Sequence, residues 1–121
     1  MTPEELYQQA GGDYAEAKMR LMNDSMISRF VVKFLDDPTF AQLKEGWDAQ
    51  DAGVIGTASH TLKGVAGNLA LSTLYQSSME LCEMYRNGAP DDLDLAKATY
   101  ERVCADHERA FAAISAFRDQ Q

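Results

Sequence analysis

A regular stripe of mostly apolar side chains runs through the last quarter of the chain. From residue 93 to residue 117 its members recur in alternating steps of three and four: Leu93, Ala96, Tyr100, Val103, His107, Ala110, Ile114 and Phe117. This heptad-like spacing aligns them on one face of an α-helix, as in helices that pack nearly antiparallel in a bundle. The stripe therefore predicts a long final helix and favours a helical bundle.

The rest of the chain carries further helix signals. Thr2-Pro3 and Asp37-Pro38 each place a capping side chain before a proline, as helix N-termini prefer, and Asp51 is a further candidate N-cap. The stretch before Asp37 predicts another helix, with apolar residues at steps of four: Met22, Met26, Phe30 and Phe34. No segment has the alternation of a strand. We therefore predict an all-α fold, an antiparallel four-helix bundle with one or two short additional N-terminal helices, in a single domain spanning residues 1–121.

Charge and hydropathy restrict the classes of partner. The net charge of −8 argues against nucleic acid and anionic membrane surfaces. The longest apolar runs are a few residues, too short to insert into a bilayer. The N-terminal twelve residues are acidic and polar and lack the basic and apolar regions of a signal peptide, so the expected compartment is the cytoplasm.

The segment 53–69 is the most informative helix. On a helical wheel the core face holds Val54, Ala58, Leu62, Val65 and Leu69, with Ile55 and Ala66 at its edge. His60 lies on the opposite side, in a patch that is poor in side chains. The patch holds Gly53, Gly56, Lys63, Gly64 and Gly67. A glycine inside a helix costs about 1 kcal/mol relative to alanine, so the repeated glycines suggest that something must approach His60 closely.

These residue types together suit the transfer of a phosphoryl group. Imidazole offers a neutral nucleophilic nitrogen near neutral pH. Lys63, one turn along the helix, can offset charge on whatever is attached to the ring. Gly56 and Gly64 leave bare backbone one turn to each side of His60. Phosphoryl transfer depends mainly on positioning and charge neutralisation, which this set provides.

The run His60-Thr61-Leu62-Lys63-Gly64 resembles the H-x-L-K-G signature of histidine phosphotransfer (HPt) domains, and the resemblance covers about residues 20–117. HPt domains are helical bundles that relay phosphoryl groups between aspartates of response-regulator receiver domains. The resemblance implies that His60 is the phosphoacceptor, Lys63 stabilises the phosphate and Gly64 gives access. The family often has glycine where this chain has Ala70.

The same resemblance sets expectations for partners and cofactors. Receiver domains of response regulators and a hybrid sensor histidine kinase would be the partners, and the receiver would supply Mg²⁺. We expect no cofactor or metal of its own, and no ATP-dependent kinase activity, because no nucleotide-binding glycine-rich loop is present. Arg86 is a possible second cation, and Gly56 and Gly67 belong to the expected docking face. We expect a monomer, and the start methionine favours a stand-alone module over a domain cut from a hybrid kinase.

Two other classes of function remain open at the level of sequence. One is a non-catalytic helical adaptor that docks signalling partners without carrying phosphate. The other is a metal-binding bundle using Cys82, Cys104, His60 and His107, which would need ligands from opposite faces. The simpler interpretation makes the two cysteines small buried residues and His107 a boundary histidine that packs its ring against the bundle.

Overall fold

The computed structural model describes all 121 residues and consists of helices and their connections, which confirms the all-α class. The helices are α1 (Pro3–Ala10), α2 (Tyr14–Leu21), α3 (Asp24–Lys33), the short 3₁₀ helix η1 (Phe34–Asp36), α4 (Thr39–Asp48), α5 (Ala52–Asn68), α6 (Ser72–Met84) and α7 (Leu93–Asp119).

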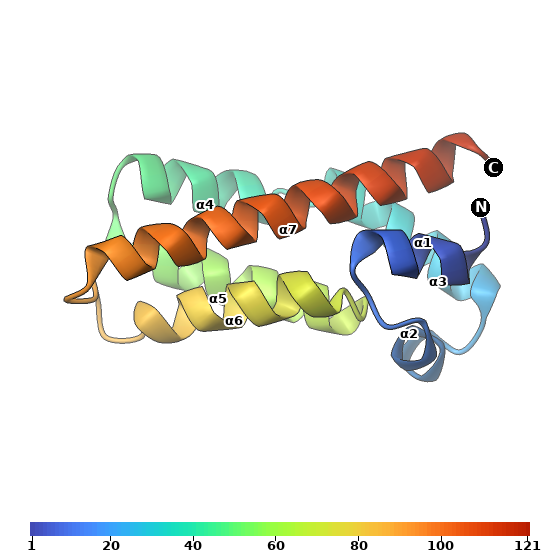
Figure 1. Cartoon of the computed structure of the whole chain (residues 1–121), viewed down its shortest axis with the longest axis horizontal. Helices are drawn as coiled ribbons and strands as arrows, with labels where there is room; N and C mark the ends of the chain where they lie inside the picture. The colour runs from blue at the N-terminus through green and yellow to red at the C-terminus, as the bar shows by residue number, and fades with distance from the viewer.

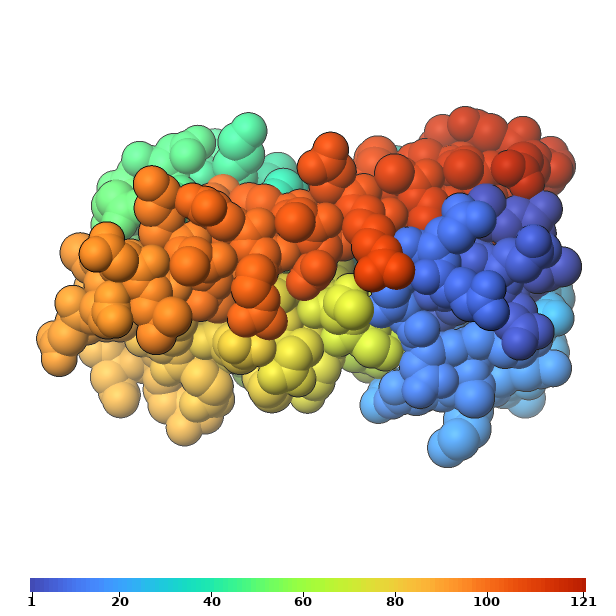
Figure 2. Space-filling view, viewed as in Figure 1, coloured from blue at the N-terminus to red at the C-terminus, as the bar shows by residue number.

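Helices α4 to α7 form the predicted bundle, and three short helices close one of its ends (Figure 1). α5 packs against both α4 and α6, and α7 packs against α6. α7 continues past this bundle to α1 and α3, and Figure 2 shows the N-terminal helices seated against its C-terminal half. Both termini lie at this end, where the Met1 ammonium donates a hydrogen bond of 2.9 Å to Gln120 Oε1. The N-terminal part thus holds three short helices rather than one or two.

The chain turns sharply between α2 and α3, where the sequence predicts one continuous periodic stretch. Met22 has a left-handed φ of 80°, and Asn23 caps α3 by accepting a hydrogen bond of 2.9 Å from the Met26 N–H. Met22 is 77% exposed, whereas Ile27 and Val31 are fully buried. The predicted stripe at steps of four is therefore only partly right: Phe34 is buried, but the turn at Met22 rotates α3 and brings Ile27 and Val31 to the core in place of Met22 and Phe30.

The N-terminal helices are fastened to the turn between α5 and α6. Tyr7 is fully buried, and its hydroxyl donates a hydrogen bond of 2.7 Å to the Leu69 carbonyl. The Asp13 N–H donates to the Ala70 carbonyl over 2.9 Å. A Cβ on Gly12 would stand 2.8 Å from that same carbonyl, so this close approach requires glycine. These contacts fix the C-terminal end of α5.

Ala70 takes the conformation that glycine favours. Its φ is 56°, in the left-handed region, and the residue is 2% exposed. Its own N–H donates to the Gly67 carbonyl over 3.1 Å. Ala70 thus forms the left-handed turn even though it is not the glycine that the resemblance leads one to expect there. The packing of the surrounding core offsets the strain that its Cβ causes in this conformation.

α7 begins where the sequence indicates, at the Asp92 cap, whose carboxylate accepts a hydrogen bond of 2.9 Å from the Leu95 N–H. Its predicted stripe faces the core, with these members buried: Ala96, Tyr100, Val103, Ala110, Ile114 and Phe117. Leu93, in the first turn, is instead 55% exposed. Neither α7, at 27 residues, nor any other helix combines the length and apolar character that crossing a bilayer requires.

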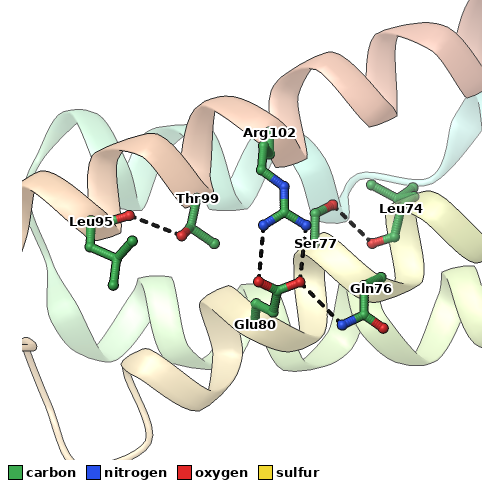
Figure 3. A network of polar contacts seen from close by, with 7 residues as sticks. All are labelled: Leu74, Gln76, Ser77, Glu80, Leu95, Thr99 and Arg102. Carbon is green, nitrogen blue, oxygen red and sulfur yellow. Dashed lines mark hydrogen bonds and ion pairs between the residues drawn. The ribbon is translucent and has the colours of Figure 1, made fainter.

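A polar network joins α6 to α7 on the surface (Figure 3). Both terminal nitrogens of Arg102 donate to the Glu80 carboxylate over 2.9 Å, and Gln76 donates to the same carboxylate over 3.1 Å. The Arg102 guanidinium, helped by Gln76, lowers the pKa of Glu80 to about 2. Because both charged side chains are roughly half exposed, we expect the pair to contribute at most about 1 kcal/mol to stability.

His107 packs among aromatic rings, as the sequence suggests. Its ring stacks on Phe40 with centroids 3.9 Å apart, and Phe34 and Phe111 lie within 6 Å. Burial lowers the pKa of His107, and the Asp37 carboxylate partly opposes this shift. The folded protein therefore favours the neutral ring.

This shift predicts a loss of stability in acid. Below pH of about 6.5 the unfolded chain protonates His107 more readily than the folded chain does, so stability falls until the lowered folded pKa is passed. His107→Phe, which keeps a stacked ring, should remove this contribution. Urea unfolding at pH 7.5 and 5.5 should show a larger loss for wild type than for the variant. Equal losses would mean that His107 titrates alike in both states.

Candidate functional site

α5 carries the candidate site and is held on both flanks. Asp51 caps it, as predicted, by accepting a hydrogen bond of 3.2 Å from the Val54 N–H. Its buried residues are Ile55, Ala58, Ser59, Leu62 and Ala66. Val54, which the sequence placed in the core, is 39% exposed, and Val65 is only half-buried. The core face is thus rotated from the predicted one toward Ile55, Ser59 and Ala66.

Small polar residues explain this rotation. Ser59 on α5 and Ser77 and Ser78 on α6 are fully buried. Short side chains let two helices approach closely. Because serine is mostly exposed in proteins, an apolar pattern does not mark Ser59 as a core residue. The Ser59 hydroxyl donates to the Gly56 carbonyl within its own helix over 3.1 Å, which satisfies it in the interior.

His60 faces outward from the middle of α5, as the helical wheel indicates, and is exposed. Lys63 is half-buried, and no carboxylate lies within ion-pairing distance of its ammonium. A Cβ built on Gly64 would meet no atom within 4 Å. The structure therefore brings together on one helix face a histidine, a cation without an acidic partner and an open stretch of backbone.

Two of the other three glycines of this face, Gly56 and Gly67, have internal roles that the sequence did not reveal. A Cβ on Gly56 would stand 3.2 Å from the Tyr85 carbonyl oxygen, and one on Gly67 would stand 3.1 Å from the Tyr75 ring. Both glycines thus let α6 approach α5. Their part in docking a partner stays a prediction, since packing alone accounts for them, whereas nothing inside the molecule accounts for Gly64.

Stability measurements separate these two kinds of glycine. Gly64→Ala should raise the free energy of unfolding by about 0.5–1 kcal/mol, because alanine is the better helix former and its methyl group meets nothing. Gly56→Ala should lack this gain or lose stability, because its methyl group presses on a backbone carbonyl. Urea unfolding of both variants is the test, and equal stabilisation would contradict the packing role of Gly56.

An open hollow of about 400 Å³ lies beside the histidine, at the N-terminal end of α5. His60 and Arg86 both line it, together with Gly53, Gly56 and Gly88. The Arg86 guanidinium donates to the Glu83 carboxylate over 2.7 Å and is 68% exposed. The structure thus places Arg86 in the same hollow as His60, where its guanidinium forms an ion pair with Glu83.

Cys82 is the residue near the histidine that the sequence interpretation missed. Its Sγ lies 3.9 Å from Nδ1 of His60, and the residue is half-buried rather than a core residue. A signal was present: His60 and Cys82 each lie eleven residues from Leu71, in the turn between two antiparallel helices. Residues equally far from such a turn face each other.

The four residues considered for a metal site do not meet at one point: His60 and Cys82 lie 3.9 Å apart, and neither of the other two joins them. His107 lies in the aromatic cluster on α7, and the thiol of Cys104 on the same helix has a pKa raised by burial. Both cysteines are free, and no group of three or more histidine, cysteine or carboxylate side chains is arranged to hold a metal ion.

Comparison with known proteins gives one match. The family model described as Hpt domain matches residues 31–112, which is more than half of the chain and includes His60, Lys63 and Gly64. Neither a curated protein nor a solved structure matches the chain significantly. The family match and the helical bundle agree with the resemblance drawn from the H-x-L-K-G run, and the chain belongs to the Hpt domain family.

Proposed function

We propose that this protein is a phosphotransfer intermediate of a cytoplasmic phosphorelay and that His60 carries the phosphoryl group. The observation that carries the proposal is the open face of α5. His60 is exposed, Lys63 beside it has no acidic partner, and the space over Gly64 is empty. No packing requirement of the bundle accounts for this combination, whereas a partner domain that must reach the ring needs it.

The donor would be an aspartyl phosphate on the receiver domain of a response regulator, with the receiver's own Mg²⁺. Nε2 of His60 attacks phosphorus with its lone pair, the N–P bond forms, and the P–O bond to the aspartate breaks as the carboxylate leaves. Lys63 offsets negative charge on the phosphoryl oxygens. The reverse step passes the group to an aspartate of a second receiver, so a hybrid sensor histidine kinase and a response regulator would be the partners.

Transfer from a labelled receiver tests this function. A receiver domain carrying ³²P-aspartyl phosphate is mixed with the purified protein, which we expect to act as a monomer. The protein should take up label that is stable in alkali and labile in acid, as phosphohistidine is. ATP with the protein alone should give no label. If several receivers bind the folded protein but none transfers phosphate, the alternative of a non-catalytic adaptor replaces this proposal.

Lys63 should act on the rate of transfer more than on docking. Lys63→Ala should slow single-turnover uptake about tenfold or more, because it removes a charge that opposes the one on the transferring group. Lys63→Arg should recover most of the rate, and both variants should bind the unphosphorylated receiver as wild type does. Rapid-quench kinetics measure the rate, and an unchanged rate in Lys63→Ala would exclude this role.

A further inference from the structure

We propose that Cys82 is a positioning residue for His60: its sulfur accepts a hydrogen bond from Nδ1–H and so leaves Nε2 unprotonated, ready to attack phosphorus. The inference rests on the proposed function of His60. It assigns a role to a side chain of α6 that the H-x-L-K-G run does not include.

The geometry singles out the sulfur. Sγ of Cys82 lies 3.9 Å from Nδ1 of His60, within the longer reach of contacts to sulfur, and no other side chain or backbone group bonds to this ring. Because Nδ1 faces α6, the opposite edge of the ring, which carries Nε2, faces away from α6. The half-buried thiol therefore lies on the α6 side of the ring.

The chemistry decides which atom donates. A neutral imidazole has one N–H and one lone pair, and the hydrogen bond at one nitrogen fixes the state of the other. If the thiol donated to Nδ1, the proton would sit on Nε2 and block attack there. If Nδ1–H donates to sulfur, Nε2 keeps its lone pair. As the N–P bond forms, the ring gains positive charge, and an acceptor at Nδ1–H then stabilises the transition state more than the ground state.

A small donor tests this role without docking. Phosphoramidate can transfer its phosphoryl group to Nε2 as its own P–N bond breaks and ammonia leaves. Cys82→Ala should slow this uptake about three- to tenfold, whereas Cys82→Ser, which keeps a hydrogen-bond acceptor, should restore it to within about twofold. Cys104→Ala is the matched control, a change at the other half-buried cysteine, and should leave the rate unchanged.

A spectroscopic readout separates positioning from packing. Long-range ¹H–¹⁵N correlation spectra at pH 8 report which nitrogen of a histidine ring carries the proton. In wild type and Cys82→Ser the proton of His60 should lie on Nδ1, and in Cys82→Ala it should shift toward Nε2, the form an unconstrained imidazole favours. His107, whose ring packs in the aromatic cluster with Phe40, is the internal reference.

Either of two results overturns the inference: a wild-type His60 with its proton on Nε2, or a Cys82→Ala variant with unchanged tautomer and rate. The wild-type spectrum alone decides the first, even where a variant fails to fold. If no donor phosphorylates wild type, the proposed function of His60 fails, while the spectrum still reports whether Cys82 sets the tautomer. The two failures are thus distinguishable.

Discussion

His60→Gln abolishes phosphoryl uptake while the bundle stays folded. We expect a loss of at least about a hundredfold, because glutamine has the bulk to replace the ring on an exposed position but no nucleophilic lone pair. Helicity, urea unfolding and binding to an unphosphorylated receiver should stay near wild type, since the imidazole makes no core contact. The measurement is label transferred from a phosphorylated receiver in a single turnover.

The second histidine supplies the matched control. His107→Gln removes a ring from the aromatic cluster and should cost stability, but it should leave uptake of phosphate intact in the folded protein. If His60→Gln takes up label at a rate near wild type, phosphate goes elsewhere and the role assigned to His60 is wrong.

Gly64→Leu should block transfer from a receiver while making the protein more stable. Side chains on a helix point back toward its N-terminus, so leucine at position 64 would lie over the turn that holds His60. Displacing the partner by about 1 Å can cost about a hundredfold in rate, and we expect a loss of about ten- to a hundredfold. The free energy of unfolding should rise by up to about 1 kcal/mol, because nothing stands within 4 Å of the new Cβ.

Two comparisons test whether blocked access to His60 causes the loss of rate in Gly64→Leu. Gly64→Ala should keep most of the transfer rate, since a methyl group is too short to cover the ring. Uptake from phosphoramidate should fall less than about threefold in Gly64→Leu, because a small donor does not dock on the helix. A receiver-driven rate unaffected by leucine would show that partners do not approach over Gly64.

Much of the fold could be predicted because it depends on local signals. The Asp51 and Asp92 caps start α5 and α7 where the sequence indicates, and the stripe of α7 is buried almost throughout. The outward position of His60 follows from periodicity alone. The family match then agrees with the H-x-L-K-G run, whose residues lie on one turn and a half of one helix and need no tertiary information to be recognised.

What escaped prediction depends on contacts between helices. Met22 breaks a regular stripe through a left-handed turn that no glycine or proline announces. Buried Ser59 rotates the core face of α5, and the close approach of α6 explains Gly56 and places Cys82 behind His60. The features of Ser59, Gly56 and Cys82 depend on how α5 packs against α6, and a pattern along a single helix carries no record of its neighbour.

The position of the phosphate is the most direct test of the account. The protein is phosphorylated by a receiver, digested under neutral to alkaline conditions, and analysed by tandem mass spectrometry. We predict one phosphoryl group, on the peptide that contains His60 and on that residue itself, with the peptide that contains His107 unmodified. A phosphoryl group on any other side chain, with His60 free, would contradict the account.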